Sequence, residues 1–334
     1  MRQYAFGRRL IFSLVLATST LFYFGCKNEA NITTPAALPV KLKVPVFDKD
    51  SAFAYIQTQV DFGPRVPGTE AHKRCGDWMV GRLKACGARV IEQPFTGKTF
   101  SGISFQARNI IASFNEKVRP RIILAAHWDT RFIADQDPEM KNKNTPLPGA
   151  DDGGSGVGVL LEIARQLQAN PIPNLGIDLL FFDAEDQGGE GSDPESWCQG
   201  AQHWALHKHT AGYQAKYGIL LDMVGGKSPR FTKEGTSVQY ASAFVDKVWT
   251  LAQRMGYGNY FVNEVSPAII DDHYFINRMT NIPMIDIINR PTNNEFVAHW
   301  HTLEDKIENI DREALKATGQ VVLAVIYREA NGDL

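Results

Sequence analysis

The sequence predicts an α/β protein, a three-layer α/β/α sandwich around a central mixed, largely parallel and twisted sheet. Continuous apolar runs, typical of strands covered on both faces, alternate with helical patterns, and alternation of this kind favours parallel strands. The first three runs also end in histidine or aspartate. The predicted strands are 121–127 (RIILAAH), 175–183 (LGIDLLFFD), 217–222 (YGILLD) and 282–288 (IPMIDII), and the predicted helices between and after them are 156–168, 199–208, 241–255 and 311–329.

Two further elements precede this alternation. A helical pattern runs from Thr69, a plausible N-cap, to Ala85, and Gly87 ends it. Alternating residues over 89–95 then predict a strand that leads into a hairpin near Gly97. We see no internal repeat and no second domain.

Composition excludes several classes of protein. The chain has 334 residues, of which 44% are hydrophobic, and a formal net charge of -2. It is too apolar for a disordered chain and too neutral to bind nucleic acid through bulk charge. Four cysteines cannot be the main framework of a chain of this length, so we expect a hydrophobic core to hold the fold together. Cys75 and Cys86 share one helical pattern but lie about 16 Å apart at the helical rise, too far for a disulfide, while pairing of Cys198 stays open.

The first 25 residues are typical of a targeting segment. Three arginines precede an uncharged run from Leu10 to Gly25, which is short for a membrane span. The run ends at Cys26 in a pattern that resembles the cleavage box of bacterial lipoproteins, although Tyr23 stands where leucine is usual; an ordinary secretory signal is the alternative. We therefore predict a signal peptide over 1–25, a lipidated Cys26 with a flexible tether over 26–43, and one catalytic domain over 44–334. The expected location is periplasmic, with a lipid anchor in a bacterial membrane.

Polar side chains follow the predicted strands. They are His127 and Asp129 at the first strand, Asp183, Glu185 and Asp186 at the second, Asp222 at the third, and Asp151 and Asp152 in the glycine-rich loop GADDGGSG. Ligands bind at the carboxyl ends of strands in open α/β sheets, so we expect these groups to share one cleft. Gathered carboxylates need a cation, and Asp with His ligands suits a catalytic zinc.

Each of these residues also has a simpler interpretation. His127 could be a buried hydrogen-bonded histidine, Asp151 a helix N-cap, and the Glu185-Asp186 pair a solvated turn. The glycine-rich loop lacks the phosphate-binding patterns GxxxxGK[ST] and GxGxxG. The joint occurrence of these groups at successive strand ends favours a site.

The order of motifs resembles one family. PRVPGTEAHKRCGDWM, AAHWDT, GADDGGSGVGVLLEIAR, LLFFDAED, LLDMVG, DDH and WHTLED follow one another between about Phe53 and Tyr327. Together they are similar to the zinc aminopeptidase-like fold, and within it to the glutaminyl-peptide cyclotransferases. The animal members carry glutamate at the position of Asp186.

The resemblance implies two alternatives for the metal. In the cyclases it implies one zinc ion on Asp151, Asp186 and His301. In the aminopeptidases it implies two zinc ions, with His127 and Asp222 added to these ligands. Trp300 before His301, and the Asp-Asp-His sequence that begins at Asp271, favour the cyclase.

The resemblance further implies conversion of N-terminal glutamine to pyroglutamate with loss of ammonia. Glu185 is the expected proton shuttle, Asp271 the partner of the leaving amide nitrogen, and Asp222 its neighbour in a buried acid network. Trp300 is the expected apolar wall for the glutamine side chain. Peptides or proteins with N-terminal glutamine are the expected substrates, and we expect a monomer.

Overall fold

The computed structural model describes residues 41–189, 191, 193–291 and 295–334, and Lys41–Leu334 form one compact unit. The predicted signal peptide, Cys26 and most of the predicted tether lie outside the described residues. No helix in the described part of the chain is long and apolar enough to cross a membrane.

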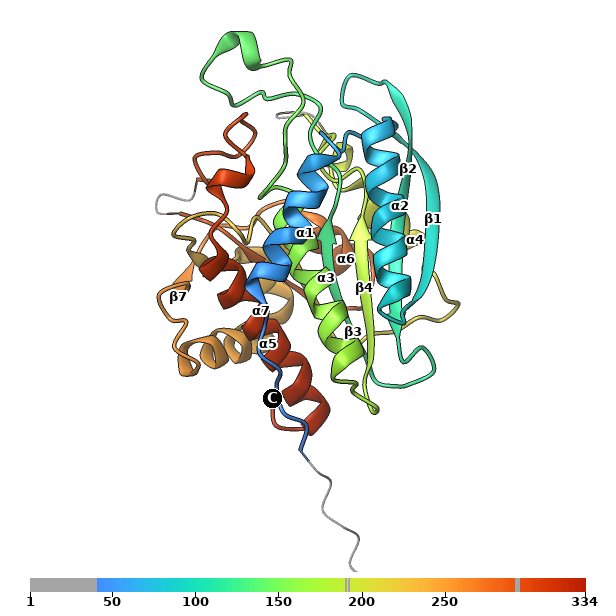
Figure 1. Ribbon diagram of the computed structural model, residues 1–334, viewed down its shortest axis with the longest axis vertical. Helices are drawn as coiled ribbons and strands as arrows, with labels where there is room; N and C mark the ends of the chain where they lie inside the picture. Colours follow the sequence, from blue (N-terminus) through green and yellow to red (C-terminus); the bar gives the residue numbers. More distant parts are fainter. Residues whose placement is uncertain (1–40, 190, 192, 292–294) are drawn as a thin grey trace, which may run out of the picture. The chain divides into compact units, whose positions relative to one another are not determined.

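A six-stranded sheet forms the centre of the unit (Figure 1). β3 pairs in parallel with β4 and β5, and β5 with β8, whereas the β1-β2 hairpin adds antiparallel strands at one edge. The mixed, largely parallel sheet predicted from the apolar runs is confirmed. In spatial order the strands are β1 (Arg89–Lys98), β2 (Ser104–Phe114), β4 (Gly176–Phe182), β3 (Arg121–His127), β5 (Gly218–Asp222) and β8 (Met284–Ile288).

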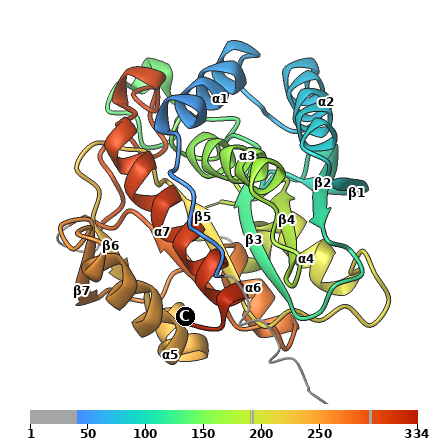
Figure 2. The same cartoon turned by 60° about the horizontal axis from the view of Figure 1, so that its bottom comes forward.

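Helices cover both faces of this sheet. They are needed on both, because successive apolar side chains of β3 point to opposite faces. Ile122 and Leu124 face one core, whereas Ile123 and Ala125 face the other. Figure 2 shows the helices of the first face lying across the strands. On the first face pack α1 (Lys49–Asp61), α2 (Glu70–Ala85), α3 (Gly154–Ala169), α5 (Gly235–Arg254) and α7 (Arg312–Asn331); on the second pack α4 (Gln199–Leu206) and α6 (Asp272–Met279).

Smaller elements complete the unit. A two-stranded parallel sheet joins β6 (Phe231–Lys233) to β7 (Phe261–Val265). The 3-10 turns are η1 (Met140–Asn142), η2 (Pro194–Ser196) and η3 (Ile307–Asn309).

All the predicted strands and helices are present, with shifted ends, and the hairpin predicted near Gly97 is the β1-β2 pair. The extent of β2 was not predicted, and α1, α6, β6 and β7 were not predicted at all. α5 begins six residues before the predicted start at Ala241, where its backbone departs from helical geometry (φ -144°, ψ 36°). Cys75, Cys86 and Cys198 are buried free thiols, so none of these three forms a disulfide.

A buried glutamate joins α5 to the segment that precedes α6. The carboxylate of Glu234 accepts hydrogen bonds from the backbone N–H groups of Thr236 (2.7 Å), Ser237 (2.7 Å) and Ile269 (2.9 Å). His273 Nε2 of α6 lies 2.8 Å from the same carboxylate. Burial opposes ionisation, but the contact with His273 and the amide donors outweigh it and hold the pKa of Glu234 at about 2.

We expect Glu234→Gln to lower the free energy of unfolding at neutral pH by about 3 kcal/mol, since the depressed pKa stabilises the fold by that order. This stabilisation is present above the ordinary pKa of glutamate and is lost as pH falls from about 4.5 toward 2. Urea unfolding at pH 7 and pH 3 measures both values. Glu264→Gln, which alters an exposed carboxylate paired with Arg230, is the control. It should leave the free energy of unfolding unchanged at both pH values. An equal loss for Glu234→Gln at both pH values would contradict the assignment.

Candidate active site and metal centre

The carboxyl ends of β3, β4 and β5 meet at one edge of the sheet and open into a cavity of about 550 Å³. Its size is that of a small-molecule site. Glu185, Asp186 and Asp222 reach it from the ends of β4 and β5, as predicted. Its lining also contains the predicted residues Asp271, Trp300 and His301, and beside them Asp152.

Three buried side chains can hold a metal ion at this cavity. One ligand atom each from Asp152, Asp186 and His301 lies within 4.8 Å of the others. His301 Nε2 is 3.0 Å from Asp186 Oδ1 and 3.8 Å from Asp152 Oδ2. Ligand atoms of a tetrahedral zinc ion lie about 3.4 Å apart at ordinary bond lengths. The second oxygen of Asp186 has no hydrogen-bond partner although it is buried, so this donor set fits zinc.

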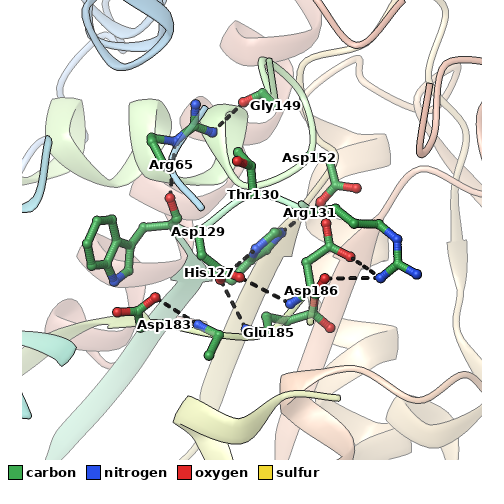
Figure 3. A network of polar contacts seen from close by, with 12 residues as sticks. Arg65, His127, Asp129, Thr130, Arg131, Gly149, Asp152, Asp183, Glu185 and Asp186 are labelled. Atoms are coloured by element: carbon green, nitrogen blue, oxygen red, sulfur yellow. Dashed lines mark hydrogen bonds and ion pairs between the residues drawn. The ribbon is translucent and has the colours of Figure 1, made fainter. Parts of the chain in front are cut away.

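The outer contacts of these ligands support the same conclusion. Asp135 Oδ1 lies 3.2 Å from His301 Nδ1, and such a carboxylate orients a metal-binding imidazole. Arg131 lies 3.5 Å from Asp186 Oδ1 and donates to the carbonyl oxygen of Asp186 (Figure 3). Although burial lowers it, the carboxylates of Asp186 and Asp135 raise the pKa of His301 to about 9, which reflects a surplus of negative charge at this point.

A second triad shares Asp152 with the first. His127 Nε2 lies 3.0 Å from Asp152 Oδ1 and 3.2 Å from Asp222 Oδ1. Figure 3 shows Asp152 and Asp186 on the same side of the His127 ring. Asp152 therefore has one oxygen toward each triad, which is the geometry of a ligand able to bridge two ions.

The predicted ligand Asp151 is wrong by one position. Its Oδ1 accepts the backbone N–H of Gly225 (2.8 Å), and its Oδ2 lies 2.8 Å from His299 Nε2, away from the metal-binding groups. Neighbouring side chains of an irregular loop point in different directions, so an error of one residue exchanges the inward side chain for the outward one. Asp152 takes the ligand position.

A buried aspartate holds the turn after β4 through hydrogen bonds. Asp129 accepts hydrogen bonds from the backbone N–H groups of Glu185 (3.0 Å) and Asp186 (3.2 Å) and from the side chain of Gln187 (2.9 Å). The turn begins at Ala184, which has a φ of 56°, uncommon for a residue with a side chain. These contacts direct Glu185 and Asp186 into the cavity wall.

Glu185 lies beside two groups from other segments. Its carboxylate, the thiol of Cys198 and a carboxylate oxygen of Asp271 lie within 4.8 Å of one another, and Cys198 Sγ donates to Glu185 Oε1 at 3.2 Å. Burial raises the pKa of Glu185 well above its ordinary value; the positive charge of His127 opposes this, and the carboxylate of Asp271 adds to it. A carboxyl group whose pKa is raised in this way holds a proton more readily than an ordinary glutamate, which suits a group that accepts and donates a proton in turn.

Asp222 belongs to the same acid network. Burial, opposed by the contact with His127 and increased by the charge of Asp271, raises the pKa of Asp222 to about 7. Asp222 and Asp271 both line the cavity.

Aromatic rings form the apolar side of the cavity. Trp300 stacks on His301 with ring centroids 3.7 Å apart, and Phe296 stacks on Trp300 at 4.5 Å. Trp197 lies parallel to His301 at 6.2 Å. The lining contains Ile269 as well, so the predicted wall at Trp300 is larger than expected.

Some roles at the site were not predicted. Asp129 and Asp152 were expected among the polar groups of the cleft, but not as a support of the turn after β4 or as a candidate ligand, and Asp135 was not singled out; their acidic side chains were the available signal. Trp197 lies in a loop with no recognisable pattern.

Comparison with known proteins shows which proteins the chain is similar to. Residues 109–326 match the family model described as peptidase family M28. The chain is similar to a glutaminyl-peptide cyclotransferase of Drosophila melanogaster, with 27% identity over 74% of this chain and 72% of the relative.

Solved structures give higher identity. A Zn-dependent exopeptidase from Parabacteroides distasonis is 52% identical, with a TM-score of 0.83 over 85% of this chain and 99% of that one. A glutaminyl cyclase from Bacteroides thetaiotaomicron, bound to N-acetylhistamine, is 49% identical with the same TM-score and the same coverage.

The corrected ligand assignment can be tested by substitution. We expect Asp152→Asn to weaken zinc binding by more than about 100-fold, because it removes a charged ligand rather than an outer contact. We expect Asp151→Asn to weaken it by less than about 10-fold, since asparagine keeps an acceptor for Gly225. Competition with a chromophoric chelator measures both affinities, with circular dichroism as the control for folding. The opposite order would restore Asp151 as the ligand.

Proposed function

The chain belongs to peptidase family M28, and we propose that it is a glutaminyl cyclase, which converts the N-terminal glutamine of peptides and proteins to pyroglutamate with release of ammonia. The observation that carries the proposal is the convergence of Glu185 and Asp271 on one cavity wall beside the zinc-binding triad. They come from different segments, yet both face the place where a glutamine amide would lie.

The substrate supplies its own nucleophile. The α-amine nitrogen forms a bond to the γ-carbonyl carbon, the carbon–nitrogen bond of the amide breaks, and a five-membered lactam and ammonia result. Because both reacting groups belong to one residue, orientation lowers much of the barrier. Trp300, Phe296 and Ile269 provide apolar surface on which the glutamine methylenes can pack and from which water is excluded.

Glu185 moves the proton. Its carboxylate accepts a proton from the α-amine as the ring closes and donates it to the departing nitrogen, so the reaction needs no other proton source. Asp271 accepts a hydrogen bond from the amide NH₂ and holds it toward Glu185. Asp152, Asp186 and His301 would hold the zinc ion, which would supply a Lewis acid for the γ-carbonyl oxygen.

We propose a single zinc ion at this triad. His127 already lies within hydrogen-bond distance of Asp222 (3.2 Å) and 3.0 Å from Asp152, so a protonated imidazole can neutralise these carboxylates without a second ion. The same geometry is what favours the alternative function, a di-zinc aminopeptidase, in which His127 and Asp222 would be ligands and Glu185 would activate water.

The decisive experiment uses a peptide that begins with glutamine. We expect the purified protein to remove the mass of ammonia from it and to hold one zinc per chain. Glu185→Gln should lower this activity by at least about 100-fold with zinc still bound, because the variant loses the proton carrier.

Glu195→Gln, an exposed carboxylate of the loop after β4, is the control and should keep full activity. Loss of the whole first residue, together with two zinc ions per chain, would identify the aminopeptidase instead.

The location of the protein is a separate proposal. The basic start, the uncharged run and Cys26 support export and attachment to a bacterial membrane through a lipid on Cys26, with the enzyme, as a monomer, acting on exported proteins. We expect Cys26→Ser to move the protein from the membrane fraction to the soluble fraction of cells, as measured by fractionation and immunoblotting. A variant that remains in the membrane fraction would exclude the lipid anchor.

A further inference from the structure

Backbone N–H groups of the loop that carries Asp152 donate hydrogen bonds to one buried aspartate. Asp305 is 1% exposed. Its Oδ1 accepts the N–H of Asp151 (2.7 Å), and its Oδ2 accepts the N–H of Asp152 (3.2 Å). Its carbonyl oxygen accepts the N–H of Ala150 (3.3 Å). Three consecutive amides of the loop are thus bound by one residue.

Asp305 and the ligand His301 belong to one short, internally bonded segment. The N–H of Asp305 donates to Thr302 O (3.1 Å), and the N–H of Thr302 donates to His299 O (3.1 Å). Successive turns of this kind leave little freedom between His301 and Asp305. If Asp305 were displaced, the imidazole of His301 would therefore be displaced as well.

Asp151 makes a second link between the same two segments. Its carboxylate bridges His299 Nε2 and the N–H of Gly225, which follows β5. A Cβ at Gly226 would lie 2.7 Å from this carboxylate and 3.0 Å from the His299 ring, so the close approach requires glycine.

Backbone carbonyl groups of the segment that leads into the Asp152 loop accept hydrogen bonds as well. The guanidinium of Arg65, which is fully buried, donates to Pro148 O (2.9 Å), Gly149 O and Trp128 O (3.1 Å) (Figure 3). Arg65 and Asp305 together occupy the donors and acceptors on both sides of the loop, so its conformation is fixed before any ligand binds.

We propose that Asp305 is a positioning residue of the zinc site, which fixes the backbone at Asp152 and so holds that ligand in register with His301. A carboxyl group whose two oxygens accept two successive amides restricts the torsions between them, and these torsions decide where the Asp152 side chain points. The inference rests on the zinc site of the proposed function but not on the reaction, because metal binding is measured directly.

The test compares two buried aspartates that contact the same segment. Asp305→Asn keeps the side-chain volume but places an NH₂ group against a backbone N–H. Asp137→Asn is the matched control, because Asp137 also accepts two backbone N–H groups, those of Leu303 (3.0 Å) and Glu139 (2.9 Å), but none from the loop of Asp152.

We expect Asp305→Asn to weaken zinc binding by about 10- to 100-fold in chelator competition, the usual effect of losing an outer contact of a metal site. The visible absorption spectrum of the cobalt-substituted variant should differ from that of the wild type, since ligand geometry changes. Asp137→Asn should leave affinity within about 3-fold and the spectrum unchanged. Wild-type affinity and spectrum in Asp305→Asn, or equal losses in both variants, would overturn the proposal.

A measurement on the unaltered protein keeps the proposal testable if Asp305→Asn does not fold. The amides of Ala150, Asp151 and Asp152 should stay protected from hydrogen exchange after zinc is removed, because Asp305 holds them without the metal. Loss of this protection on zinc removal would show that the metal orders the loop, and the proposal would be wrong. Neither result depends on whether the enzyme cyclises glutamine.

Discussion

Burial of several carboxylates at the carboxyl edge of a parallel sheet is the constraint on which the other features of this molecule depend. Asp152, Asp186 and Asp222 are each less than 10% exposed, and buried negative charge is stable only beside positive charge or hydrogen-bond donors. The protein supplies the imidazoles of His127 and His301 and the guanidinium of Arg131. A zinc ion at Asp152, Asp186 and His301 would complete this balance.

The backbone around the cluster is specialised for this purpose. Ala184, Met223 and His301 all have positive φ values, and each is either a candidate ligand or the neighbour of an acid that lines the cavity. Such conformations cost free energy and persist only where surrounding contacts impose them. Here those contacts come from buried aspartates: Asp129 holds the turn after β4, and Asp305 holds the loop before α3. Acidic residues therefore act at two levels, as metal ligands and as supports for the loops that carry them.

The positions of the acids at this site are compatible with two reactions, cyclisation and hydrolysis. Asp152 lies between two triads, so the geometry can accept one ion or two. What separates cyclisation from hydrolysis is the nucleophile, and a cavity with apolar aromatic walls favours a substrate that folds back on itself over one that needs a water molecule. Glu185 would be the proton carrier in either reaction, because its position beside Asp271 does not change.

The sequence by itself determined the fold class, the strands that carry the site and most of its residues, because apolar runs and the acids that follow them are local patterns. Helix α1 and the extent of strand β2 were missed, since their patterns are too mixed to stand out from the neighbouring chain. Only the tertiary structure decided between Asp151 and Asp152. The choice depends on hydrogen bonds to Gly225 and Asp305, which lie 74 and 154 residues further along the chain, and no local pattern encodes the direction in which a loop side chain points.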